Sequence, residues 1–318
     1  MPSPRSARPG SKAAERGKGP GVPAGAAVKA APFAYARPST VAAAVAELTR
    51  AGGEGKVLAG GQSLVPVLAM RLARPSVLVD INAVTGLDEL ALDGGELSVS
   101  AAVRQRRLEH DKRTAAVPLL GLALPWVGHR ELRSRGTVCG SLAHADPAAE
   151  LPAVAACLDA ALEVTGPSGR RTVAAREFFT GAMTTSLQPD EVLTRVRFPV
   201  AGPGDGFGFA EFARRHGDFA LAGVAVRVRQ PGGGSSRDAV LAAFGVSDRP
   251  VVRDVTPLLD LGPDEDQLTG AMGELADEIV DTGGDVHASA GYRRQLLAAL
   301  AARELARAMR QSGESDDD

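Results

Sequence analysis

The stretch KVLAGGQSLVPVLAMRLARPSVLVDIN, from Lys56 to Asn82, decides the fold expected for the first half of the chain. A short apolar strand leads into a glycine-rich turn, an apolar helix follows, and a second strand, SVLVDI, comes next. Glycines let a backbone approach an anion closely, and the N–H groups at the start of the helix would point at it. The stretch predicts either a phosphate-binding loop at Gly60 and Gly61 or a plain turn between strand and helix.

A second passage, GTVCGS from Gly136 to Ser141, has the same composition of small residues and hydroxyls. Two such loops fit a ligand with two phosphates, such as a dinucleotide, better than a monophosphate. Neither loop contains the G-x-G-x-x-G pattern of a Rossmann fold or the G-K-[ST] of a Walker loop. The two common phosphate-binding folds are therefore excluded.

Composition limits the classes of function. Hydrophobic residues make up 44% of the 318 residues, charged residues 23%, and the formal net charge is −2. This charge argues against a nucleic-acid partner, and no apolar run reaches the roughly 18 residues of a membrane span. The two cysteines, Cys139 and Cys157, cannot by themselves hold an iron–sulfur cluster or a four-cysteine zinc ion. We expect a soluble, cytoplasmic protein with no metal site.

The order of patterns predicts an α+β fold. A helix capped by Ser39 or Thr40 comes first, and a hairpin turns at Asp93-Gly94-Gly95. Residues 129–152 form a long polar and glycine-bearing passage with little periodicity. Trp126, just before it, is predicted to belong to the core.

After a Gly/Pro-rich break near residue 202, three antiparallel strands precede two helices, Asp264 to Asp281 and Ala288 to Gln311. This change in the order of elements predicts a domain boundary. The composition of residues 1–28 predicts a disordered tail, and residues 313–318 form an acidic one.

Four motifs resemble those of one family in the same order: LAGGQSL, LVDIN, RGTVCGSLAHADPAAELP and RRHGDFALAGVAV. They are similar to the FAD-binding subunits of molybdenum hydroxylases, among them the medium subunit of aerobic carbon monoxide dehydrogenase and the FAD module of xanthine dehydrogenase. The resemblance covers about residues 30 to 312. It implies a vanillyl-alcohol-oxidase (PCMH)-type FAD-binding domain of two α+β subdomains over 29–202. A small C-terminal domain of three antiparallel strands and helices is implied over 203–312.

The resemblance also implies which residues bind FAD. The first loop would wrap the pyrophosphate, the second loop would complete that grip, an acidic residue would bind a flavin-side hydroxyl, and two apolar residues would lie beside the flavin. These residues are, in chain order, Ala59, Gly60, Gly61, Gln62, Ser63, Leu64, Val127, Thr137, Gly140, Ser141, Glu150 and Leu193. The flavin supplies the redox chemistry, so no catalytic residue of the chain itself is expected.

Two positions depart from the family pattern. The second motif usually carries Gly-Gly, whereas Cys139 stands at the first of these positions. The xanthine dehydrogenase branch has a lysine near the flavin where this chain has Ala210. The lysine contact is therefore absent or replaced.

The function implied by the resemblance is electron transfer. An iron–sulfur small subunit would deliver electrons from a molybdenum large subunit, in a heterotrimer or a dimer of heterotrimers, and FAD would pass them to an external acceptor. The alternatives are a stand-alone FAD-dependent oxidase or dehydrogenase of the same superfamily and a flavin-free assembly protein. The sequence names neither the substrate nor the acceptor.

Overall fold

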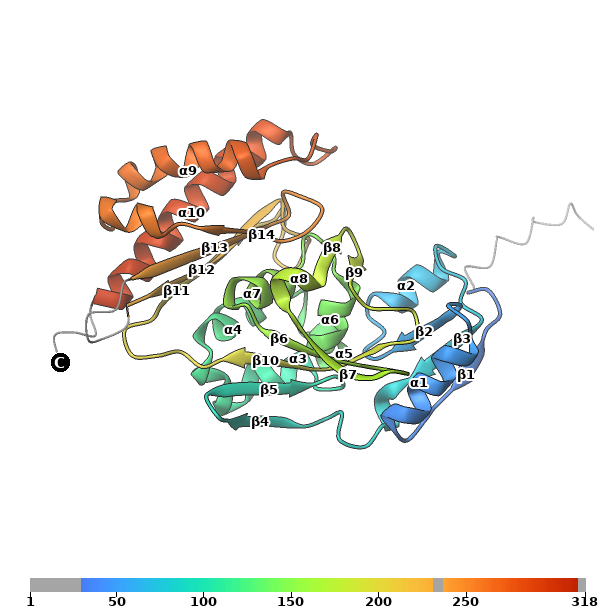
Figure 1. Cartoon of the computed structure of the whole chain (residues 1–318). Coiled ribbons are helices and arrows are strands. Elements are labelled where there is room, and N and C mark those ends of the chain that lie inside the picture. Colours follow the sequence, from blue (N-terminus) through green and yellow to red (C-terminus); the bar gives the residue numbers. More distant parts are fainter. Residues whose placement is uncertain (1–29, 231–236, 314–318) are drawn as a thin grey trace, which may run out of the picture.

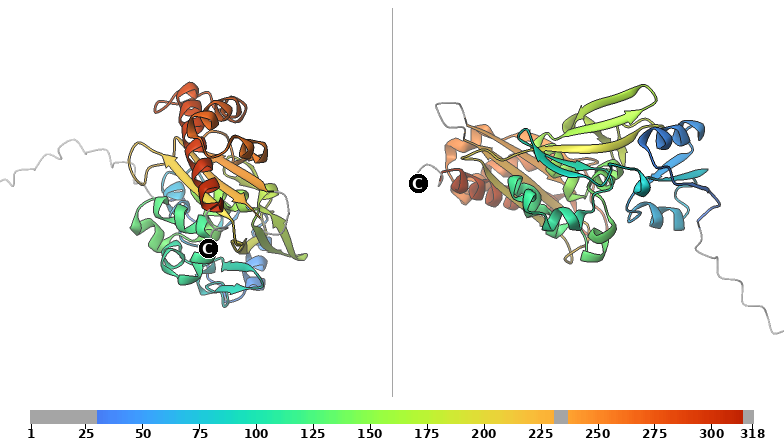
Figure 2. Two further views of the ribbon diagram at one scale, coloured as in Figure 1. Left: turned by 90° about the vertical axis from the view of Figure 1, so that its left-hand side faces the viewer. Right: turned by 90° about the horizontal axis from the view of Figure 1, so that it is seen from below.

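The computed structural model describes residues 30–230 and 237–313. The predicted tail at 1–28 lies outside these residues, as does all of the acidic tail except Gly313. The described chain is elongated, with a small parallel sheet at one end, a five-stranded sheet in the middle and a four-stranded sheet with two long helices at the other end (Figures 1 and 2). Within the described ranges no helix is both long and apolar enough to cross a bilayer.

The small sheet is parallel and carries the first loop. Its strand order is β1 (Ala34–Ala36), β3 (Val77–Asp80), β2 (Gly55–Leu58). Helix α1 (Val41–Arg50) buries one apolar face, and the Thr40 hydroxyl accepts the Ala43 N–H to cap it, which confirms one of the two predicted caps. Helix α2 (Leu64–Ala69) starts directly after the loop.

The five-stranded sheet is antiparallel. Its order is β4 (Leu90–Asp93), β5 (Glu96–Ser100), β10 (Val192–Pro199), β6 (Ala161–Gly166), β7 (Gly169–Ala174). The predicted hairpin is confirmed as β4–β5, and Gly94 and Gly95 both take positive φ, +58° and +78°. Such a turn needs residues without a β-carbon penalty, which explains the Gly-Gly pair.

Short helices cover one face of this sheet. Of these helices, α6 (Val138–His144), α7 (Glu150–Leu158) and α8 (Ala175–Phe178) contact its strands, as does the 3-10 turn η2 (Lys112–Ala116). Further short elements lie around them: α3 (Gln105–His110), α4 (Pro118–Ala123), α5 (Arg130–Arg135), η3 (Leu124–Trp126) and a ribbon of β8 (Phe179–Gly181) and β9 (Thr184–Thr185). The 3-10 turn η1 (Ile81–Ala83) follows β3 and contacts β2 of the small sheet. Residues 129–152, which show little periodicity in the sequence, contain α5, α6 and the start of α7. Helices of six or seven residues complete less than two turns and leave almost no periodic signal.

The C-terminal sheet has four strands rather than the predicted three. They are β11 (Gly206–Phe212), β12 (Ala222–Arg229), β13 (Asp238–Phe244) and β14 (Val251–Asp254), in that order and antiparallel. Strand β14 was missed because its four residues follow a Pro and include two charges, VVRD.

Both faces of this sheet are buried. One face packs on α4 and α7 within the main core, and the other packs on α10 (Ala290–Gly313), against which α9 (Glu265–Ile279) lies, with η4 (Thr256–Leu261) beside it (Figure 1). The two predicted C-terminal helices are thus confirmed to within a few residues. A sheet covered on both faces explains the nearly continuous apolar strands β12 and β13.

Candidate functional site

The two glycine loops, some 75 residues apart in sequence, lie in direct backbone contact. A β-carbon added to Gly60 would stand 2.4 Å from the Arg135 carbonyl oxygen and 2.7 Å from the Gly136 Cα. Both neighbours are backbone atoms, so no side-chain rotation could make room. Gly60 is therefore required for the first loop to lie against the second.

The first loop, Ala59 to Leu64, is shaped by Gly61. Its φ of +75° is strained for residues with a β-carbon. The first intrahelical bonds run from Val65 N–H to Gly61 O (3.0 Å) and from Val67 N–H to Ser63 O (3.3 Å), so the loop can offer the preceding N–H groups to an anion. The Gln62 amide folds back on the Gly60 carbonyl (3.1 Å), and the Ser63 hydroxyl makes no capping hydrogen bond.

The second loop, Gly136 to Ser141, is organised by Thr137. This buried side chain accepts the Gly140 N–H (3.0 Å) and so caps α6. Gly140 lies close beneath it, and a β-carbon there would stand 2.6 Å from the Thr137 hydroxyl oxygen. Half-buried Ser141 follows. Thr137 thus has a structural role in the loop, and its contact with a phosphate stays a prediction.

Cys139 points away from the loop surface. Its side chain is 2% exposed, lies in the main core, and its thiol donates to the Val99 carbonyl in β5 (3.6 Å). Burial raises the pKa of this thiol to about 12. Because Cys139 sits in a helix with ordinary backbone angles, the departure from Gly-Gly does not distort the loop.

An arginine and an asparagine tie the two loops together. Asn82 donates its amide to the Ala59 carbonyl (2.9 Å), and Arg104 donates to the Asn82 amide oxygen (2.6 Å) and to the Arg135 carbonyl (2.5 Å). The Asn82 backbone N–H is in turn held by the Asp80 carboxylate (2.9 Å). Sequence reasoning missed this tie, although Asp80 and Asn82 belong to the LVDIN motif.

Glu150 lies at the first position of α7 and is 8% exposed. Burial raises the pKa of its carboxyl to about 7, the charge of Asp146 adds to this, and Arg133 opposes it. At neutral pH this carboxyl can therefore donate as well as accept a hydrogen bond. Asp146 itself accepts the Ala148 N–H (2.9 Å) in the turn before α7.

The two predicted apolar contacts lie in different surroundings. Val127 is half-buried in a turn that Arg133 fixes, since Arg133 donates to the Val127 and Gly128 carbonyls (3.1 Å each). Leu193 is 4% exposed in β10, opposite Val164, next to an irregularity in the ladder. Trp126, predicted to be core, is 36% exposed and meets His216 edge to face, so that expectation was wrong.

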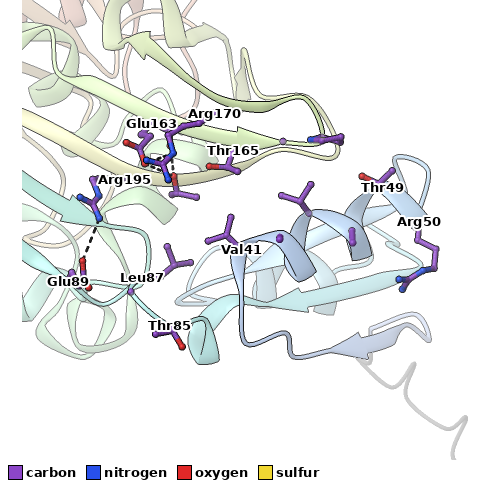
Figure 3. Close-up of a pocket in the computed structure, with 17 residues that line it drawn as sticks. Val41, Thr49, Arg50, Thr85, Leu87, Glu89, Glu163, Thr165, Arg170 and Arg195 are labelled. Carbon is purple, nitrogen blue, oxygen red and sulfur yellow. Dashed lines mark hydrogen bonds and ion pairs between the residues drawn. The ribbon is translucent and has the colours of Figure 1, made fainter.

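A separate cavity of about 760 Å³ opens between α1 and the β6–β7 hairpin (Figure 3). It takes no lining residue from either glycine loop. Its charged side chains are paired, Arg195 with Glu89 (3.6 Å) and Arg170 with Glu163 (3.4 Å). Paired charges offer no obvious anchor for a ligand, so the cavity is a less suitable site than the loops.

The geometry of the loops suits a diphosphate. The loops meet through backbone at Gly60, α2 starts within the first loop, and Arg104 donates to the Arg135 carbonyl beside that contact. Backbone N–H groups at the start of a helix and a nearby cation are groups that bind phosphates. Of the residues described, no three histidine, cysteine, aspartate or glutamate side chains gather as metal ligands would.

Two family models match the chain. Residues 31–201 match the FAD binding domain in molybdopterin dehydrogenase, and residues 207–308 match the CO dehydrogenase flavoprotein C-terminal domain.

Individual relatives extend over nearly the whole described chain. The chain is 36% identical over 279 residues to the 6-hydroxypseudooxynicotine dehydrogenase complex subunit alpha of Paenarthrobacter nicotinovorans, covering 87% of this chain and 94% of that protein. It is 34% identical to the carbon monoxide dehydrogenase medium chain of Afipia carboxidovorans, covering 87% and 96%. The structure of carbon monoxide dehydrogenase from Hydrogenophaga pseudoflava superposes with a TM-score of 0.81 at 30% identity, covering 89% of this chain and 99% of that one.

Proposed function

Because the chain belongs to the family of FAD-binding medium subunits of molybdenum-containing dehydrogenases, we propose that it passes electrons from an iron–sulfur partner to an external acceptor. FAD can accept electrons singly and deliver them in pairs, which is the chemistry this role requires. The protein's own contribution is to bind, orient and shield that cofactor. The observation that carries the proposal is the contact of the two glycine loops at Gly60.

In this proposal the predicted residues hold the two ends of the cofactor. Ala59, Gly60, Gly61, Gln62, Ser63 and Leu64 contact the pyrophosphate from one side and Thr137, Gly140 and Ser141 from the other, while Glu150, Val127 and Leu193 contact the flavin half. Support comes from the backbone shape of the loops and from the buried carboxyl of Glu150, which suits a hydroxyl partner.

The relatives support the view that another subunit chooses the substrate. Two proteins with nearly equal identity to this chain, 36% and 34%, are named after a nicotine derivative and carbon monoxide. These two substrates differ so much in size and polarity that one binding pocket would not recognise both. A subunit that bound these substrates would be expected to differ in its pocket. We therefore place substrate oxidation in a molybdenum subunit and electron relay in this chain.

An exposed apolar surface is the candidate docking face for the iron–sulfur partner. It comprises Trp126, Leu132, Phe212, Phe219 and Tyr292, of which Phe219 is 71% exposed. Trp126 meets His216 edge to face, and Phe212 meets Tyr292, so the surface joins the turn before the second loop to the C-terminal domain. Large apolar patches on a protein surface mark interaction sites more often than isolated apolar residues do.

The test compares the isolated chain with the assembled complex. Anaerobic flavin absorbance should bleach with dithionite in the isolated full chain but not with carbon monoxide, purines or aldehydes. Coexpression with an iron–sulfur and a molybdenum subunit should make the flavin reducible by one of these substrates. Bleaching of the isolated chain by a substrate would identify a self-sufficient oxidase, and a chain that binds no FAD would be an assembly protein.

The docking face has its own variant. Phe219→Ser should reduce copurification of the iron–sulfur subunit while leaving flavin content unchanged, because Phe219 lies outside both loops. Leu92→Ser, an exposed apolar residue on the distant β4 strand (45% exposed), is the matched control and should copurify as the native chain does.

A further inference from the structure

Glu211 is a buried carboxyl that faces the FAD-binding part of the molecule. Along β11, Phe207 and Phe209 point into the main core, while Gly206 and Gly208 lie against α10 on the other face. Side chains two residues apart share a face of a strand, so Glu211 follows Phe209 toward α4 and α7.

Neither oxygen of Glu211 has a hydrogen-bond partner among the described residues. Both are closed to solvent, and the residue is 7% exposed. A buried carboxylate without a partner is costly, and such a group takes up a proton instead. An unsatisfied buried acid in a native fold indicates a missing partner.

Glu150 is the charged neighbour of Glu211. Burial and then the charge of Glu150 raise the pKa of Glu211 to about 8. Glu150 in turn feels Asp146 and Arg133. The other elements against this side of β11 offer no countercharge, since α4 (PLLGLA) and η3 (LPW) carry no ionisable side chain and Gly223 stands opposite Glu211 on β12. The charged residues of α10 belong to the helix on the opposite face, where Glu304 packs on Gly208.

We infer that Glu211 and Glu150 form a proton-holding carboxyl pair whose missing hydrogen-bond partner is the bound FAD, and that FAD binding draws a proton onto this pair. The inference rests on the proposed function for the presence of FAD. A neutral carboxyl can donate to the carbonyl, ring-nitrogen or hydroxyl acceptors of such a cofactor, whereas a carboxylate cannot. FAD also brings two negative phosphates, which favours the protonated pair further.

The proton balance fixes the sign of the pH dependence. Well below pH 7 both carboxyls already hold their protons in the free protein, so binding takes up none. Above pH 8 the free pair has lost a proton that the complex regains from the buffer. The FAD dissociation constant should be flat at low pH and rise up to about tenfold per pH unit above pH 8, which is the linkage slope for one proton.

The experiment is calorimetric titration of FAD into the deflavinated full chain, in pairs of buffers with different ionisation enthalpies, from pH 6 to 9. Native chain should take up close to no proton at pH 6 and approach one at pH 9. Glu211→Gln, which mimics the neutral acid, should bind FAD at pH 7 within about threefold of native and lose most of the proton uptake at pH 9. Glu163→Gln, another buried carboxyl but ion-paired with Arg197 (3.2 Å), is the control and should keep the native profile.

The outcomes separate the two proposals. FAD binding without pH-dependent proton uptake, or with uptake unchanged in Glu211→Gln, overturns the carboxyl pair and leaves the electron-transfer proposal standing. A native chain that binds no FAD overturns the proposed function itself. If Glu211→Gln does not fold, infrared difference spectra of the native chain decide, since FAD addition at pH 9 should increase the protonated-carboxyl band, and no increase would contradict the inference.

Discussion

The two glycine loops use small residues for different reasons. In the first loop, Gly60 has no room for a β-carbon and Gly61 has a backbone angle that other residues resist. In the second loop, the position filled by Cys139 needs neither, since its side chain enters the core. A motif position can thus require glycine because there is no room for a β-carbon, because φ is positive, or not at all. The surrounding structure shows which of these applies.

The largest effect is expected for Gly60→Ala. Its new β-carbon would overlap the backbone of Arg135 and Gly136, so the loops must separate, at a cost of about 1–3 kcal/mol or more. FAD affinity, measured by fluorescence titration, should fall at least tenfold. Gly273→Ala in α9, where a β-carbon meets nothing within 4 Å, is the control and should bind FAD normally. Unchanged affinity in Gly60→Ala would show that loop contact is not needed for binding.

An intermediate effect is expected for Gly61→Ala. Holding alanine at a φ of +75° costs about 1–2 kcal/mol, and the strain can be relieved only by changing the loop that meets the ligand. Gly94→Ala carries similar strain in the β4–β5 turn. Both variants should lose similar thermal stability, but only Gly61→Ala should lose FAD affinity. Equal affinities would place the ligand elsewhere.

The smallest effect on FAD is expected for Cys139→Ala. Removing a buried sulfur should lower the free energy of unfolding by about 1 kcal/mol, as small core deletions do, without touching the loop surface. FAD affinity should stay within about twofold of native, which corresponds to less than 0.5 kcal/mol. A large loss of affinity with stability intact would mean that Cys139 contacts the cofactor after all.

Much of the fold could be predicted because its signals are local. The cap at Thr40, the Gly94-Gly95 hairpin and the two C-terminal helices each depend on neighbouring residues. The short helices α5 and α6 were missed because they are too short to show a period, and the strand β14 was missed because its four residues follow a proline and include two charges. Helices and strands of only a few residues were therefore harder to predict than the longer elements.

The sequence predicted the two glycine loops of the candidate site but not the side chains that hold the loops in place or lie behind them. Arg104 and Asn82 are 22 residues apart and act through backbone carbonyls, which carry no residue signature. Glu211 was missed because a single glutamate in a strand suggests a solvent-facing position. Its spacing of two from Phe209 and four from Phe207 was the signal that could have placed it on the buried face.

The reaction rates of the two buried thiols, Cys139 and Cys157, can report local opening of the structure around each of them. Cys139 donates to Val99 inside the FAD-binding part, whereas Cys157 in α7 donates to Val240 of the C-terminal sheet (3.7 Å). Burial raises both pKa values to about 12, so neither thiol reacts while its surroundings are closed. The rate at which Cys157 is alkylated therefore measures how often the sheet β11–β14 lifts from α7, and the rate for Cys139 measures how often the second loop leaves β5. If FAD or a partner subunit slows the alkylation of Cys157, it stabilises the contact between the sheet β11–β14 and α7. If it slows the alkylation of Cys139, it stabilises the contact between the second loop and β5.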